Sequence, residues 1–76
     1  MIGTIIKEDS QLMVRVVDPM FGRLILQPDM ESRGLINTNH IADNVEGYIV
    51  KFTDTIPETG IKVNTWHFHI ESFETD

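Results

Sequence analysis

Cysteine is absent from this chain of 76 residues. Without thiols the chain can form neither a disulfide nor a thiolate zinc site, so neither can stabilise the fold. A domain of this length buries only about 60% of the surface that its unfolded chain exposes. We therefore expect one domain over residues 1–76, stabilised by the 41% of its residues that are apolar, by partner subunits, or by both.

Basic residues are also few, with 6 Lys and Arg against 12 Asp and Glu and a formal net charge of −6. A chain with so little positive charge is not expected to bind duplex nucleic acid, which needs a basic surface. No apolar run approaches the roughly 18 residues of a membrane span. The first residues show no basic segment followed by an apolar one, the pattern of a secretory leader. The sequence predicts a cytoplasmic protein with no membrane partner.

Recognisable catalytic motifs are missing as well. The serines lie in turn-like segments without a nucleophile-elbow motif, and no glycine-rich phosphate loop is present. Carboxylates are plentiful, but no pair of them stands out as buried and coupled. We therefore predict that the chain is not an enzyme and needs no cofactor.

Short apolar stretches separated by turn residues dominate the chain. Strands are predicted over 2–6, 11–17, 23–27, 47–52 and 61–70 because these segments are apolar or alternate between apolar and polar residues. In the last of them Trp66 and Phe68 fall on one face and His67 and His69 on the other. The expected core contains six residues: Val14, Val16, Tyr48, Val50, Trp66 and Phe68.

Residues 30–46 have no clear period. They are expected to form one long irregular loop, with one helical turn around 38–44, capped by Asn37 or Thr38, as an alternative. Together the elements predict an all-β fold, either a small barrel or two packed curved sheets.

Three segments resemble small SH3-like β-barrel domains of bacterial and phage accessory proteins. They are Val14-Arg15-Val16-Val17-Asp18-Pro19, Gly47-Tyr48-Ile49-Val50-Lys51-Phe52 and the aromatic strand 66–74. The resemblance covers about half of the chain. It implies a five- to six-stranded SH3-like barrel with one long irregular loop (30–46), and a module that works by binding. It carries over no catalytic residue.

Candidate ligand-binding residues combine cations that could contact a phosphate with rings that could contact a base. They are Arg15, Arg23, Tyr48, Lys51, His67 and His69. The alternative is that they are ordinary surface residues. His67 and His69, two positions apart, could also present two imidazoles to one metal ion, but metal sites need further ligands.

Apolar residues are in surplus on faces and turns that should be wet, which often marks a protein partner. A strongly curved barrel that buries parts of both faces would explain the surplus equally well. The protein-interaction candidates are Met13, Met20, Phe21, Leu35 and Ile36.

The leading hypothesis is a phage-type accessory or inhibitor protein that forms a homo-oligomer and binds a host protein. The alternative is an oligomeric small-molecule binder that sequesters a nucleotide-like signal in an anti-defence role. A histidine-based metal site is the third possibility.

Overall fold

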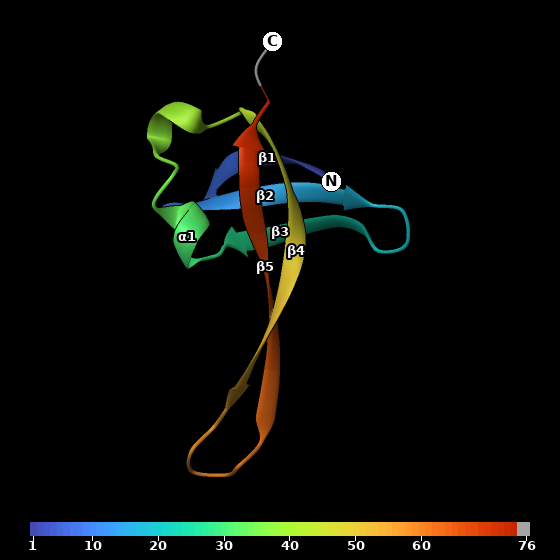
Figure 1. The fold of residues 1–76 in the computed structure, drawn as a ribbon, viewed down its shortest axis with the longest axis vertical. Coiled ribbons are helices and arrows are strands. Elements are labelled where there is room, and N and C mark those ends of the chain that lie inside the picture. The colour runs from blue at the N-terminus through green and yellow to red at the C-terminus, as the bar shows by residue number, and fades with distance from the viewer. Residues whose placement is uncertain (75–76) are drawn as a thin grey trace.

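The computed structural model describes residues 1–74, which form a closed barrel of five strands (Figure 1). The strands are β1 (Ile2–Glu8), β2 (Gln11–Asp18), β3 (Gly22–Pro28), β4 (Asn44–Thr55) and β5 (Lys62–Phe73). Two short helical turns, α1 (Met30–Arg33) and the 3-10 helix η1 (Thr38–His40), lie between β3 and β4. The predicted all-β class and the small five-stranded barrel are confirmed.

The strand order around the barrel is β1-β2-β3-β5-β4, and β4 closes onto β1. Neighbouring strands are antiparallel except β3 and β5, which pair in parallel where Gln27 lies opposite His67 and Pro28 opposite Phe68. The segment that carries α1 and η1 leads the chain from β3 to the start of β4 beside β1. There the amide of Ile5 donates to the carbonyl of Asp43, at 2.9 Å.

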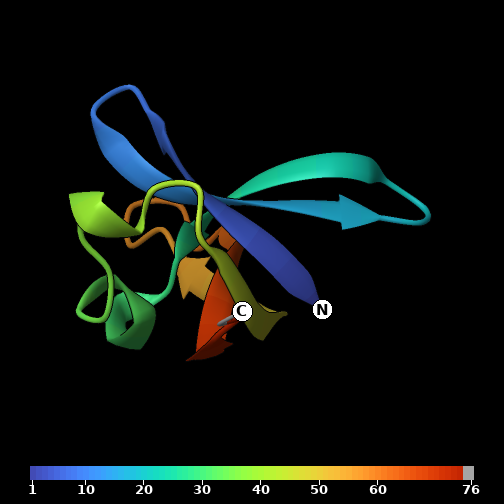
Figure 2. The ribbon, with the colours of Figure 1, turned by 90° about the horizontal axis from the view of Figure 1, so that it is seen from above.

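Tight turns connect the first three strands. Asp9 and Ser10 both have positive φ, at 50° and 66°, as a two-residue type I′ hairpin requires. At the β2–β3 turn, Asp18 Oδ1 accepts hydrogen bonds from the amides of Met20 and Phe21, at 2.7 and 2.9 Å. Figure 2 shows the β1–β2 turn and the β2–β3 hairpin projecting on opposite sides of the barrel.

Phe68 occupies the core and is fully buried. The other buried apolar side chains come from β1, β2, β4, β5 and the loop after α1: Ile5, Val14, Val16, Ile36, Val45 and Ile70. The predicted core is therefore right for Val14, Val16 and Phe68. It is wrong for Trp66 and Tyr48, which are 51% and 47% exposed, and Val50 is half-buried.

The prediction placed the wrong face of β4 in the core. The register places Ile49 opposite Phe68 and Gly47 opposite Ile70, so the odd-numbered residues of β4 face the core. Gly47 is required there because a methyl group at its position would overlap the His69 carbonyl oxygen and come within 2.8 Å of the Phe68 ring. Alternation alone cannot say which of the two faces is buried, and the larger rings suggested the wrong one.

β4 and β5 continue beyond the barrel as a two-stranded ribbon (Figure 1). We call residues 51–66 the arm. Its ladder runs from Lys51 opposite Trp66 to Thr55 opposite Lys62, and Ile56 donates to the carbonyl of Ile61 at the turn, at 2.8 Å. The arm gives the molecule its long dimension, with extents of 48 × 28 × 23 Å. Trp66 lies at its base, past the end of the core, which explains its exposure.

Residues 30–46 are more ordered than expected. The predicted helical turn is confirmed as η1, whose cap Asn37 accepts a hydrogen bond from the Asn39 amide at 2.8 Å. The predicted long irregular loop is wrong at both ends, because α1 begins at Met30 and β4 at Asn44. A helix of four residues is too short to produce a period in the sequence.

The contrast between Phe68 and Trp66 gives a stability prediction. Phe68→Ala should lower the free energy of unfolding by about 3–5 kcal/mol, because it empties a fully buried aromatic site. Trp66→Ala should cost clearly less, since half of the indole is in solvent. Urea denaturation followed by circular dichroism measures both. Equal losses from the two variants would contradict this account of the core.

Candidate functional site

A network of three side chains joins α1 to β5. Asp29 caps the helix through Oδ1, which accepts a hydrogen bond from the Ser32 amide at 2.9 Å. The second oxygen of Asp29, Oδ2, lies 2.6 Å from His69 Nδ1. Ser32 is fully buried, and its Oγ accepts a hydrogen bond from the Ile70 amide at 2.7 Å. The helix is therefore fixed to the outer side of β5 by polar contacts.

This network shifts the pKa values of both ionisable partners. Burial alone would raise the pKa of Asp29, but hydrogen bonds from Ser32 and His69 outweigh it and lower that pKa from 3.8. The hydrogen bond to Asp29 raises the pKa of His69 above 6.5, with burial opposing the shift and the charges of Asp29, Glu31 and Glu71 adding to it. His69 is thus a structural partner of Asp29.

His67 lies in a different environment on the same face. It lines a hollow of about 380 Å³ between α1 and the arm, together with Asp29, Met30, Glu31, Arg33, Phe52, Asp54 and Thr65. Its ring meets Phe52 edge-on at 5.2 Å, and its buried Nδ1 has no hydrogen-bond partner within residues 1–74. The predicted shared face of His67 and His69 is confirmed by their common orientation on β5.

A metal site at these histidines lacks further ligands. No group of three or more His, Asp or Glu side chains that could hold a metal ion occurs in the part of the chain that the structure describes. His69 is already bonded to Asp29, and the Tyr48 ring lies beside it with centroids 5.1 Å apart. Tyr48, His67 and His69 therefore form one group on the α1 side of β5.

The predicted cations lie elsewhere. Arg15 is paired with Ile25, and Arg23 with Val17, so both arginines are on the outer face of the β2–β3 hairpin. The outward positions of this face, 13, 15, 17, 23, 25 and 27, contain no carboxylate. Both guanidinium groups are exposed.

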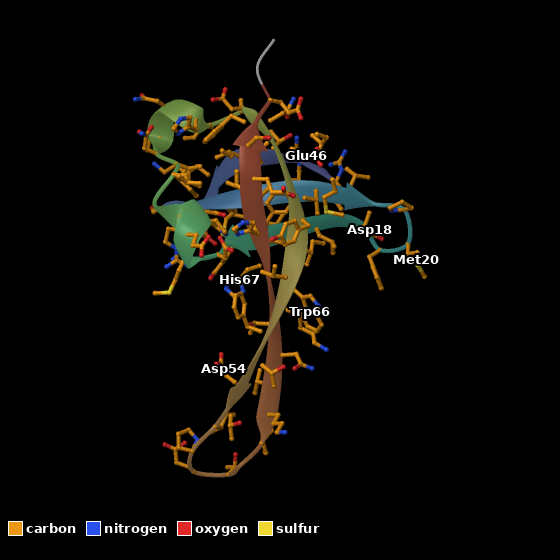
Figure 3. The ribbon with its side chains drawn as sticks, in the orientation of Figure 1. Asp18, Met20, Glu46, Asp54, Trp66 and His67 are labelled. Atoms are coloured by element: carbon orange, nitrogen blue, oxygen red, sulfur yellow. The ribbon has the colours of Figure 1, made fainter. Side chains whose placement is uncertain are left out.

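Lys51 is also separate from Tyr48, His67 and His69, because it lies directly opposite Trp66 on the arm. Lys51 shares the face of Phe68 and Trp66, beyond the end of the barrel, because the odd-numbered residues of β4 face the core. Trp66 lines a hollow of about 390 Å³ with Met13, Ile25, Leu26, Gln27, Thr65 and His67. Figure 3 shows the Trp66 and His67 side chains pointing to opposite sides of β5.

The structure therefore divides the predicted ligand set. Arg15, Arg23 and Lys51 lie on the side of Trp66, and the remaining three residues lie beside α1. Sequence reasoning missed Trp66 as a surface residue because a lone Trp in an apolar strand is usually buried. Trp66 is the first apolar residue on its face of β5, because Asn64, two positions earlier, is polar. This position was the one available signal.

The protein-interaction candidates also separate. Met20 and Phe21 are 85% and 73% exposed at the tip of the β2–β3 hairpin, and Leu35 is exposed in the loop after α1. Met13 is half-buried. Ile36 is buried in the core and is not available to a partner.

Comparisons with known proteins found no matching family model, no matching curated protein and no matching solved structure. Among residues 1–74, no helix is long and apolar enough to cross a membrane.

The Asp29–His69 pair predicts a pH dependence of stability. The raised pKa of His69 means that its contribution is complete below pH 6.5 and is lost as pH rises through the folded-state value. The lowered pKa of Asp29 means that its contribution is present above pH 3.8 and is lost as pH falls through its folded-state value. The pair should therefore stabilise the fold most between these two limits.

Thermal melts of wild type and His69→Gln, from about pH 5 to about pH 9, measure this effect. The difference in Tm between them should be largest in the acidic part of that range and should shrink above neutrality. His67→Gln is the matched control, because His67 lies on the same face but has no ion pair with a carboxylate within residues 1–74. A difference independent of pH would contradict the role assigned to the pair.

Proposed function

We propose that the chain is a non-catalytic binding module that contacts a protein partner through its two projecting hairpins. The observation that carries this proposal is the concentration of exposed apolar side chains on these hairpins. On the β2–β3 hairpin they are Val17, Met20, Phe21 and Ile25, and on the arm Phe52, Ile56, Ile61, Val63 and Trp66. Figure 3 shows Met20 at the tip of the first hairpin and Trp66 on the arm.

Exposed apolar side chains occur on both faces of the arm. Phe52 and Val63 lie on one face, whereas Trp66 lies on the other. An isolated two-stranded ribbon is only marginally stable in water, and exposed apolar patches on soluble proteins usually mark partner sites. These features suit a ribbon that is enclosed by a partner on both sides.

Self-association is part of the proposal. Past the barrel, the arm has backbone edges that pair with no third strand within the described residues. Such edges can pair with a second copy in a two-fold arrangement. This would shield the apolar faces of the arm and add buried surface to a small domain.

The finer classification is proposed by analogy. A closed five-stranded barrel is compatible with the SH3-like domains of phage accessory proteins that the sequence resembles. Its strand order, with a parallel β3–β5 pair and a helix between β3 and β4, also resembles that of OB-fold barrels. Both classes act mostly by binding, which supports a host-directed accessory or inhibitor role more than a catalytic one.

The partner proposal predicts loss of binding without loss of fold. In the variant Phe52→Ser/Val63→Ser the arm loses one apolar face, while the core should be unchanged because both side chains lie outside it. Ile41→Ser is the control, an exposed apolar residue between η1 and β4, away from both hairpins. Sedimentation at micromolar concentration measures self-association, and quantitative comparison of proteins captured by the three baits measures partner binding.

The arm variant should lose self-association, a captured partner, or both, and the control should lose neither. A monomeric wild type whose captured proteins are identical to those of the arm variant would contradict the proposal.

A second candidate function is binding of a nucleotide-like anion beside Trp66. The specific observation is that Lys51 lies opposite Trp66, and that Arg15 is paired with Ile25, which lines the Trp66 hollow. Arg23 lies further along the same hairpin face, in a chain with only six basic residues. Stacking on an exposed ring with phosphate contacts to flanking cations is a common mode of nucleotide binding. Subunits of an oligomer could sequester such a ligand between them.

Trp66 fluorescence tests this candidate directly, because no other Trp contributes. A nucleoside triphosphate should quench it, more weakly at high salt, and the corresponding nucleoside should bind less well. Arg15→Gln and Lys51→Gln should each weaken binding several-fold, whereas Lys7→Gln, on β1, should not. Fluorescence that no nucleotide changes would exclude this use of Trp66.

A further inference from the structure

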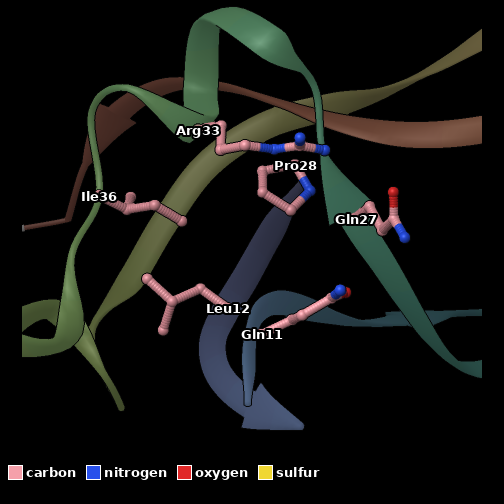
Figure 4. Close-up of a pocket in the computed structure, with 6 residues that line it drawn as sticks. All are labelled: Gln11, Leu12, Gln27, Pro28, Arg33 and Ile36. Atoms are coloured by element: carbon pink, nitrogen blue, oxygen red, sulfur yellow. The ribbon is translucent and has the colours of Figure 1, made fainter. Parts of the chain in front are cut away.

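A hollow of about 460 Å³ lies beside α1, between the start of β2 and the end of β3. It is lined by Gln11, Leu12, Gln27, Pro28, Arg33 and Ile36 (Figure 4). These residues come from four parts of the chain: the start of β2, the end of β3, α1 and the loop that follows α1. The volume is within the range of about 300–1,000 Å³ that is usual for small-molecule sites.

The floor of this hollow is apolar. Pro28 and Ile36 are buried, and Leu12 is half-buried against the core. The rim is polar and consists of the Arg33 guanidinium and the amides of Gln11 and Gln27, all three of which belong to exposed residues. Figure 4 shows the Arg33 side chain extending over the Pro28 ring toward Gln27. The arrangement places hydrogen-bond donors above an apolar surface.

Arg33 carries the only charge among the six lining residues. Its guanidinium forms no ion pair with any carboxylate in residues 1–74, although Asp29 and Glu31 are close in sequence. Asp29 is occupied by Ser32 and His69. Arg33 therefore has its hydrogen-bond donors available, in a chain where acidic residues outnumber basic ones two to one.

We propose that this Arg33 pocket binds a small organic carboxylate with an apolar body. A guanidinium donates two parallel hydrogen bonds to a carboxylate, and the two glutamine amides supply further donors. Leu12, Pro28 and Ile36 would contact the apolar body. The site differs from the surfaces proposed for a protein partner, since none of its lining residues belongs to the arm or to the β2–β3 turn, although Gln27 also lines the Trp66 hollow.

N-acetyl-leucine is a suitable probe because it carries one carboxylate and one apolar side chain. N-acetyl-leucinamide has nearly the same shape without the charge. Titration of the full chain by ¹H–¹⁵N correlation NMR follows the amides of Leu12, Gln27 and Arg33, which border the pocket. At the usual affinity per atom of small ligands, the Kd of N-acetyl-leucine should be about millimolar.

Arg33→Gln should weaken binding at least about tenfold, since it removes the charge-assisted hydrogen bonds. The variant should fold, because the Arg33 side chain makes no hydrogen bond within residues 1–74 and its backbone bond to Asp29 remains. The same spectra report whether it has. Arg33→Lys should have an intermediate affinity because it keeps the charge without the planar fork. Lys62→Gln, which removes one positive charge at the far end of the arm, should bind as wild type does.

The free carboxylate could belong to a small metabolite or to the C-terminus of a peptide. A tetrapeptide ending in leucine that binds tighter than N-acetyl-leucine would identify a peptide end, and equal affinity would identify a free small acid. The proposal would be overturned if N-acetyl-leucinamide bound as well as N-acetyl-leucine, or if Arg33→Gln bound as wild type does. It would also be overturned if neither N-acetyl-leucine nor the tetrapeptide shifted the amide resonances of Leu12, Gln27 and Arg33.

Discussion

The burial of Phe68 beneath the strand pair β4–β5 is the contact on which the fold depends. Phe68 is fully buried, lies opposite Ile49 on β4 and pairs with Pro28 on β3. β5 therefore lies between β3 and β4 and pairs with both. Gly47 leaves the space that the Phe68 ring needs. Because interiors are close-packed, this one site sets the register of β4, and with it the face that every later residue of the arm presents.

The same strand distributes the functional side chains. Side chains of β5 alternate, so His67 and His69 point toward α1 while Trp66 points to the opposite side. The helix is held on the histidine side by Asp29 and Ser32, which contact His69 and the Ile70 amide. The result is two chemically different surfaces separated by one strand. One carries the bonded His69–Asp29 pair and His67, whose Nδ1 has no hydrogen-bond partner within residues 1–74, and the other carries the exposed Trp66 indole and Lys51.

Charge is arranged in a similar way. Acidic residues predominate in the chain as a whole, yet the outer face of the β2–β3 hairpin and the lining of the Arg33 pocket contain no carboxylate. Arg33 forms no ion pair within residues 1–74, although it also lines the hollow beside His67 together with the carboxylates of Asp29, Glu31 and Asp54. Basic residues therefore occur on both of these surfaces in a chain whose formal net charge is −6.

Part of this was determined by the sequence alone. Alternation and turn residues were sufficient for the five strands, the all-β class and the opposite faces of Trp66 and His67, because strand period and turn chemistry are local properties. They left a barrel and two packed sheets open, and the barrel was expected only from the resemblance to SH3-like domains. For η1 the sequence offered Asn37 or Thr38 as the cap of a possible helical turn, and the structure shows that Asn37 is the cap. Tertiary structure decided which face of β4 is buried, since the packing of Gly47 against Phe68 joins residues distant in sequence. The tertiary structure also extends β4 and β5 beyond the barrel, which leaves Trp66 exposed. Finally, it divided the predicted ligand residues between two surfaces and built the Arg33 pocket from four separate segments, because only the closed barrel brings those segments together.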